Sequence, residues 1–415
     1  MTEYNDKKIE IMAPAGSYES LRAAINAGAD SVYFGVEQLN MRSRSANFMF
    51  DDLSKIVKIC NEHNVRSYLT VNTIVYDHDM SMIRKICEEA KKAGLTAVIC
   101  MDIAAIQIAR EIGLEVHIST QINISNIEAV KFYAQYADVV VLARELTLKQ
   151  IKSICSEIKK QDIRGPKGEL IEVEIFVHGA LCVAVSGKCY MSLATFNASA
   201  NRGACLQNCR RAYRVIDEET GDELKIDNKF VMSPSDLCTL PFLDKILDSG
   251  VKVLKIEGRG RSPDYADETV KCYKEAVEAI SKNMFTKEKV EAWMKRLKSV
   301  YNRGFWEGGY YLGKKINEWA GVEGSKTTVE KKFIGPVTNY YDKLSVAVIK
   351  VESNVFNKGD NLMITGPTTG VMKLVAGELH TDDGVVKKAQ KKIEVSFKVP
   401  KKIRKNDKVY VLKEK

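Results

Sequence analysis

The first two thirds of the chain alternate short apolar runs with longer amphipathic stretches. The runs have few polar positions, which is typical of β-strands buried on both faces. The eight runs are IEIMA (9–13), SVYFGV (31–36), RSYLTV (66–71), TAVIC (96–100), EVHIS (115–119), DVVVL (138–142), VEIFV (173–177) and VKVLKI (251–256). Strands that alternate with helices form parallel βα units, so the pattern predicts an α/β fold: a closed (β/α)8 TIM-like barrel rather than an open doubly wound sheet.

The pattern is interrupted once and changes once. Residues 178–250 separate the last two predicted strands and are expected to form an insertion over one end of the barrel. Helical spacing returns over 264–301. We therefore predict a barrel domain over 1–300, an aromatic and glycine-rich linker over 301–330, and a C-terminal domain over 331–415. The short strands and turn signals of the last domain predict a small antiparallel β-barrel.

The net charge of +9 is confined to the C-terminal domain, where residues 331–415 contain 18 Lys and Arg against 9 Asp and Glu. Lysine and arginine side chains that neutralise phosphates supply most of the sequence-independent affinity for nucleic acids. This domain is therefore predicted to bind RNA, although an ordinary solvated lysine surface would have the same composition. The predicted RNA-binding residues are Lys387, Lys388, Lys391, Lys392, Lys401, Lys402 and Arg404.

The ten cysteines fall into two groups. Without a signal peptide or a membrane-length apolar run, the expected compartment is the reducing cytoplasm, with neither disulfides nor membrane contact. Five cysteines lie in apolar-periodic segments and are predicted to be buried thiols: Cys60, Cys87, Cys100, Cys155 and Cys272. The other five are close together in the insertion: Cys182, Cys189, Cys205, Cys209 and Cys238.

The spacing of the insertion cysteines indicates a metal pocket. The intervals lack the C-x2-C pair that structural zinc sites use. Long, irregular intervals favour a [4Fe-4S] cluster, whose corners are reached from separate segments, over zinc or unligated thiols.

Polar residues follow several predicted strands, at the barrel end where active sites of this fold form. Several arginines among them favour an anionic ligand, because a guanidinium matches a carboxylate or phosphate in shape. Structural salt bridges would use the same residues. The predicted substrate-binding residues are Arg42, Arg44, Asn72, Gln121, Arg144, Glu257, Arg259 and Arg261, and the candidate catalytic residues include Asp102 and His178.

Several motifs carry a family resemblance. IMAPAGSYESLRAAINAGADSVYFG, EIFVHGALCVAVSGKCYMS, GACLQNCRR, SPSDLC and VKVLKIEGRGRS resemble the collagenase-like peptidase family U32 over essentially the whole chain. The resemblance is greatest to its tRNA-hydroxylating branch. It implies oxygen-independent formation of 5-hydroxyuridine at the wobble position, with prephenate as the hydroxyl donor and a [4Fe-4S] cluster. It places the cluster on Cys182, Cys189, Cys205 and Cys238, with an exchange between Cys205 and Cys209 left open. A free Cys209 would be a nucleophile toward the pyrimidine ring.

Other functions remain open at this point. The length and the basic C-terminal domain resemble the tRNA-acting branch more than the quinone branch and favour RNA, while hydroxylation of an rRNA cytidine or a quinone precursor stays an alternative. A protease would need a nucleophile such as Cys182 activated by His178, since the chain has neither an H-E-x-x-H nor a G-x-S-x-G motif. A non-catalytic Fe-S or RNA-binding protein is a third alternative. Besides tRNA and prephenate, an electron-transfer partner and a second protein of the same family are expected partners.

Overall fold

The computed structural model describes residues 9–37, 39–41, 47–186, 188–214, 216–223, 232–307, 310–313, 319–322 and 324–415. Eight parallel strands form a closed barrel, because β7 pairs with β9 and β9 pairs in turn with β1. The predicted barrel is therefore confirmed. Its strands are β1 (Glu10–Pro14), β2 (Ser31–Phe34), β3 (Arg66–Val71), β4 (Ala97–Cys100), β5 (Glu115–Ile118), β6 (Val139–Val141), β7 (Glu172–Gly179) and β9 (Val253–Ile256).

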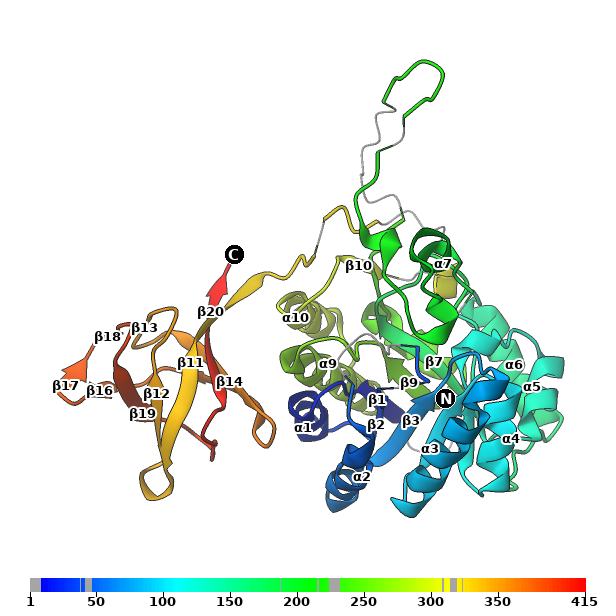
Figure 1. Cartoon of the computed structure of the whole chain (residues 1–415), viewed down its shortest axis with the longest axis horizontal. Helices are drawn as coiled ribbons and strands as arrows, with labels where there is room; N and C mark the ends of the chain where they lie inside the picture. Colours follow the sequence, from blue (N-terminus) through cyan, green and yellow to red (C-terminus); the bar gives the residue numbers. More distant parts are fainter. Residues whose placement is uncertain are drawn as a thin grey trace.

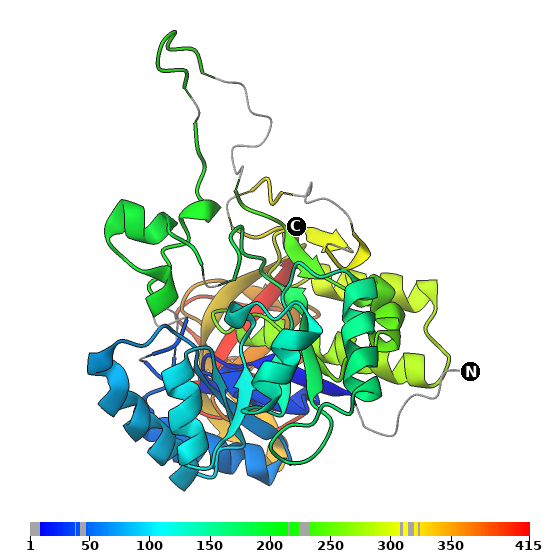
Figure 2. The same ribbon diagram turned by 90° about the vertical axis from the view of Figure 1, so that its right-hand side faces the viewer.

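Helices surround the barrel on its outer side (Figure 1 and Figure 2). They are α1 (Tyr18–Asn26), α2 (Leu53–Glu62), α3 (Met80–Lys92), α4 (Ile103–Glu111), α5 (Ile127–Ala134), α6 (Leu148–Lys160), α8 (Leu243–Asp248) and α9 (Pro263–Ser281). The predicted helical stretch over 264–301 is divided into α9 and α10 (Lys287–Lys298), with Asn283 in the left-handed region between them. Within the described ranges, no helix has the length and apolarity needed to cross a membrane.

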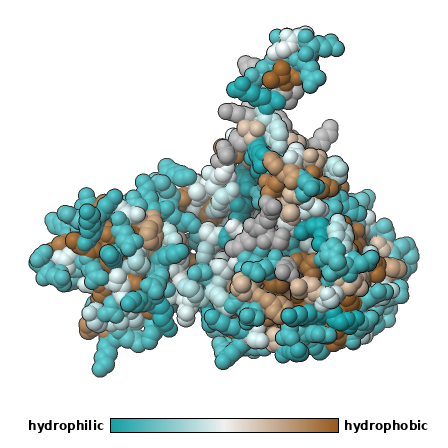
Figure 3. Space-filling model, in the orientation of Figure 1, coloured by the Kyte–Doolittle hydropathy of each residue, from teal (hydrophilic) through white to brown (hydrophobic). Residues whose placement is uncertain are grey.

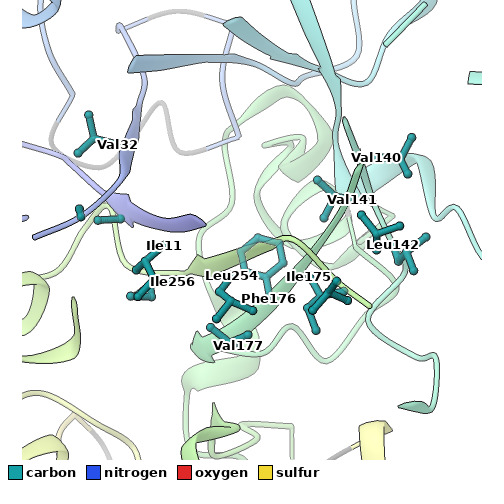
Figure 4. Close-up of a cluster of buried hydrophobic side chains, with 14 of the residues drawn as sticks. Ile11, Val32, Val140, Val141, Leu142, Ile175, Phe176, Val177, Leu254 and Ile256 are labelled. Atoms are coloured by element: carbon teal, nitrogen blue, oxygen red, sulfur yellow. The ribbon is translucent and has the colours of Figure 1, made fainter. Parts of the chain in front are cut away.

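The main hydrophobic core lies between the strands and the helices. Outward-facing residues of neighbouring strands, such as Ile11, Ile175 and Leu254, lie next to one another in this core (Figure 4). The predicted burial of the five scattered cysteines is confirmed, since all five belong to the buried residues of the chain. A second, smaller cluster fills the inside of the barrel and includes Met12, Tyr33 and Tyr68.

The insertion between β7 and β9 leaves the barrel at the carboxyl end of β7. It includes the short helix α7 (Met191–Phe196) and returns as β8 (Asp236–Cys238), which runs antiparallel to β7. Strand β10 (Phe305–Glu307) then pairs with β8. Part of the stretch predicted as a linker is therefore built into the sheet. Its Trp306 side chain is only 1% exposed.

The C-terminal domain is antiparallel, as predicted, and most of the visible face of this domain is hydrophilic (Figure 3). Eight of its strands are joined in the order β15-β14-β20-β11-β12-β19-β16-β17, around a core that includes Phe356 and Phe397. The strands are β11 (Val329–Tyr341), β12 (Val346–Lys350), β13 (Phe356–Asn357), β14 (Asn361–Gly366), β15 (Gly370–Val375), β16 (Leu379–Thr381), β17 (Gly384–Val386), β18 (Lys388–Ala389), β19 (Glu394–Lys398) and β20 (Lys408–Glu414).

This domain is docked on helices α1 and α9 of the barrel. Lys331 Nζ lies 2.6 Å from Asp264 Oδ1, and Lys373 pairs with Glu268. At the start of β15, Gly370 has φ +71°, and a Cβ there would lie 3.0 Å from the Ala23 backbone nitrogen. Only glycine allows the two backbones to approach this closely.

Gly370→Val is expected to loosen the domain interface. A valine would strain the left-handed backbone by about 1–3 kcal/mol and would also push β15 away from α1. Gly359→Val is the matched control, because Gly359 has φ +89° and a Cβ added there would meet no heavy atom within 4 Å. Amide hydrogen exchange of α1 should rise in the Gly370 variant alone. Equal exchange in both variants would contradict this docking.

Candidate active site

A pocket of about 260 Å³ lies at the carboxyl ends of the barrel strands. Its floor comes from the strands and the residues that follow them, whereas the insertion between β7 and β8 contributes much of its wall. The fold therefore brings together two sets of residues that are far apart in the sequence. Substrates of barrel enzymes bind at this end.

Four cysteines of the insertion line the pocket: Cys182, Cys189, Cys205 and Cys209. Burial raises the pKa of the Cys209 thiol, and negative charge on the three neighbouring cysteines acts in the same direction, against the Arg210 guanidinium. The four thiols are thus close enough to influence one another electrostatically. In the described ranges, no three His, Cys, Asp or Glu side chains are grouped as a site for a single metal ion.

Cys238 does not line the pocket with these four cysteines, and its assignment as the fourth ligand stays a prediction. It ends β8, is 0% exposed, and its Sγ lies 3.7 Å from Met294 Sδ. Burial raises the pKa of its thiol to about 12. Such a thiol is a small core residue, and the cysteine that shares the pocket with the other three is Cys209.

Arg259 and Arg261 line the pocket, but both are engaged by protein groups. Arg259 is buried and donates hydrogen bonds to Thr70 Oγ1 at 3.0 Å and to Asn40 Oδ1 at 2.9 Å. Arg261 lies 3.7 Å from Asp236 Oδ2, and its guanidinium is 3.8 Å from the centre of the Tyr301 ring. Their charges contribute to the potential of the pocket while their positions are fixed by these partners.

Arg144 and Lys255 provide two further positive charges, both near the Phe176 ring. The Arg144 guanidinium lies 3.9 Å from the centre of the Phe176 ring, and its buried Nε has no hydrogen-bond partner. Lys255 Nζ lies 5.4 Å from the same ring centre and 2.6 Å from Glu174 Oε1. Lys255 was missed by the sequence analysis because it lies within the apolar run VKVLKI.

Three polar residues that were predicted to bind substrate also line the pocket, namely Asn72, Gln121 and Glu257. Asn72 donates from Nδ2 to Ser119 Oγ at 3.5 Å, and Ser119 in turn donates to Gln121 Oε1. Glu257 accepts a hydrogen bond from the Ala180 backbone N–H at 3.2 Å. This contact ties the end of β9 to the start of the insertion.

The two other candidate catalytic residues, His178 and Asp102, are not among the residues that line the pocket. His178 is 1% exposed and packs against the rings of Tyr265, Tyr273 and Phe305. Burial and the Arg261 charge lower the pKa of its imidazole to about 3. It is therefore a neutral core residue, and it does not line the pocket beside Cys182 as a proteolytic dyad would require.

Asp102 caps a helix instead of facing the ligand. Its side chain is the N-cap of α4, and it accepts from the backbone N–H groups of Ala104 at 2.9 Å and Val75 at 3.0 Å. An aspartate at this position satisfies otherwise unpaired donors of the first helical turn. Its occurrence after a strand is therefore explained by capping.

The remaining predicted residues are two arginines and the basic residues of the C-terminal domain. Arg42 and Arg44 are outside the described residues. The basic residues of the C-terminal domain are exposed, and Lys402 pairs with Asp342 at 2.6 Å. Strands β17 and β18, next to Lys387 and Lys388, lie at the end of the domain away from the barrel (Figure 1).

Residues 16–321 match the family model described as Peptidase family U32. A protein named Collagenase from Porphyromonas gingivalis is 51% identical, over 98% of each chain. A protein from Methanocaldococcus jannaschii, named as an uncharacterized protease, is 38% identical, again over 98% of each chain. The tRNA hydroxylation protein P1 from Bacillus subtilis is 30% identical, over 96% of this chain and 93% of its own.

The buried His178 predicts a measurable dependence of stability on pH. Its folded pKa of about 3 is below the ordinary value of 6.5, so the unfolded chain binds one more proton between these values. The unfolding free energy should therefore fall as the pH decreases from 6.5 toward 3, by up to about 1.4 kcal/mol per unit from this group. His178→Gln should reduce this slope in chemical denaturation, whereas His78→Gln, with a 74% exposed side chain, should not. The same slope in both variants would contradict a neutral, buried His178.

Proposed function

The chain belongs to peptidase family U32, and from this membership we propose that it hydroxylates RNA without molecular oxygen. The observation that carries the proposal is the pocket itself, in which four cysteines face the cationic and polar side chains of the strand ends. A hydroxylase needs a place where a cofactor, an oxygen donor and a base meet. This pocket combines thiol ligands with groups that bind anions.

The pocket residues fit a [4Fe-4S] cluster held by Cys182, Cys189, Cys205 and Cys209. Thiolates are the ligands of such clusters, and four of them near one another require a cationic partner because they repel. Zinc is the alternative cofactor, and thiolates are ligands of both groups. Bound there, a cluster would supply electron transfer or a Lewis-acidic iron to the pocket.

The chain's own cations would bind and orient the oxygen donor. Arg144 has a buried Nε without a hydrogen-bond partner, and Lys255 places a second charge near the same Phe176 ring. A small molecule with two carboxylates, such as prephenate, would use both charges. Arg259 and Arg261, which protein groups also hold in place, would add positive potential around the donor.

Electron balance restricts the reaction further. Replacement of a C–H by a C–OH group with an oxygen atom at the level of water removes two electrons from the base. The donor or an electron-transfer partner must accept them.

The names of the relatives leave proteolysis as the competing function, since two of the proteins similar to this chain are named as a collagenase and a protease. The geometry favours hydroxylation, because His178 is a neutral core residue and does not activate Cys182. We propose tRNA as the substrate, modified to 5-hydroxyuridine at the wobble position. An rRNA cytidine, a quinone precursor and a non-catalytic RNA-binding role are the other outcomes that the experiments below distinguish.

Anaerobically purified protein is expected to contain about four irons and four sulfides per chain. Alanine replacement of any of the four pocket cysteines should remove most of the iron, because each supplies one ligand. Cys238→Ala is the matched control and should retain it. Iron and sulfide analysis checks both results. One zinc per chain, or loss of iron in Cys238→Ala with retention in Cys209→Ala, would contradict the ligand set.

A strain that lacks the protein should lose nucleosides derived from 5-hydroxyuridine in its tRNA, most clearly without oxygen, where oxygen-dependent enzymes cannot replace it. Nucleoside mass spectrometry measures the loss, and complementation with Arg144→Gln should restore little of it. Gelatin cleavage by wild-type protein that persists after removal of iron would favour the protease. A change confined to rRNA or quinones would refute tRNA as the substrate.

A further inference from the structure

The wall of the pocket has an unusual charge distribution. Residues 175–216 contain five Lys and Arg and no Asp or Glu. Three of the basic side chains are exposed, those of Lys188, Arg211 and Arg214. Lys188 and Arg211 take part in no ion pair in the described parts of the chain, whereas Arg214 lies 3.7 Å from Glu223. The stretch therefore presents positive charge for which the described residues supply little compensation.

The same stretch exposes two aromatic rings beside the pocket. Tyr190 is 71% exposed, and its two neighbours in the chain, Cys189 and Met191, both line the pocket. Phe196 ends α7 and is 51% exposed, with the Arg211 guanidinium 5.0 Å from its ring centre. Hydrophobic residues are visible on this face above the barrel (Figure 3). The Phe196–Arg211 pair combines an apolar ring face with a positive charge.

A third exposed ring, that of Tyr76, belongs to the barrel domain and contacts an arginine of the insertion. Tyr76 follows β3 and is 49% exposed, and the Arg202 guanidinium lies 4.2 Å from its ring centre. Arg202 is fixed by an ion pair with Asp79 and by a hydrogen bond to the Ile74 carbonyl oxygen at 2.9 Å. Each of the two ring–arginine pairs thus combines an exposed apolar face with a positive charge.

We propose that Tyr190, Phe196 and Arg211, together with Lys188, form a stacking platform for single-stranded RNA at the pocket entrance. Aromatic rings interleaved with basic groups are the means by which proteins hold unpaired bases, since rings stack on bases and cations bind the phosphates. A duplex hides its base faces and fits such rings poorly. This proposal rests on the proposed RNA substrate. It adds the residues of this chain that would hold the unpaired loop.

The platform also divides RNA binding between two surfaces. The exposed lysines of the C-terminal domain would bind phosphates of any RNA. The platform would select unpaired bases and direct one of them toward the cysteines. Residues 217–223, which contain five Asp and Glu, follow the platform directly and would repel RNA on that side.

Binding measurements test the platform without any turnover. The probe is a fluorescent RNA stem-loop with a seven-nucleotide loop, compared with a blunt duplex of similar length. Tyr190→Ala and Phe196→Ala should each weaken stem-loop binding by roughly 5- to 150-fold and change duplex binding little. Phe132→Ala is the matched control, because Phe132 is 47% exposed on α5, a helix of the outer barrel wall. Phe196→Leu preserves an apolar side chain and should still lose stem-loop affinity.

Charge variants separate the two surfaces. Lys188→Gln and Arg211→Gln should each lower the slope of log affinity against log salt by roughly 0.7 for the single-stranded loop. Reversal of Lys387, Lys388, Lys391 and Lys392 to Glu should weaken stem-loop and duplex equally. Unchanged stem-loop affinity in both aromatic alanine variants would overturn the platform, as would equal loss for the duplex. Gelatin that binds through Tyr190 while RNA does not would also overturn it.

These outcomes are independent of the hydroxylation test. Loss of loop binding in the aromatic variants would support the platform even if tRNA nucleosides were unchanged in the deletion strain. Conversely, normal loop binding in these variants would refute the platform while the hydroxylation proposal stood.

Discussion

Closure of the barrel between β7 and β9 is the constraint on which the rest of the structure depends. Parallel strands need a crossover, and these two pair directly although more than seventy residues separate them. The intervening chain must therefore pass from the carboxyl end of β7 back to the amino end of β9. It leaves at the carboxyl end of β7, where barrel active sites form, so the cysteines are delivered to the pocket by the connectivity itself.

The distribution of buried charge follows from the same closure. Lys255 and Glu174 lie on adjacent strands, β9 and β7, and their pair inside the barrel is 2.6 Å long. Removal of either partner would leave an uncompensated buried charge, which is strongly destabilising. The pair therefore fixes a cation in the pocket floor, opposite the thiols contributed by the insertion. Glu257, which follows β9, accepts a hydrogen bond from the Ala180 backbone N–H and so links the end of β9 to the start of the insertion.

The barrel was predictable from the sequence because its strands are continuous apolar runs of regular spacing. The alternation of side chains along a strand would also have indicated Lys255. Its neighbours Leu254 and Ile256 face the helices, so Lys255 must face the inside of the barrel. Cys238 could not be excluded by spacing alone. Whether a cysteine faces a pocket or a core depends on the strand it ends, and β8 was not predicted. The cap formed by Asp102 and the burial of His178 could not be read from the sequence, because helix caps and buried imidazoles also occur at strand ends.

The central proposal is that an RNA base binds in the cysteine-lined pocket at the carboxyl end of the barrel. Photo-crosslinking tests it most directly, with 5-iodouridine at the wobble position of a tRNA anticodon stem-loop and peptide mass spectrometry of the product. Crosslinks are predicted within residues 182–211, which contain the pocket cysteines and the platform. Crosslinks confined to the basic residues over 387–404, or to the outer helices of the barrel, would contradict the claim.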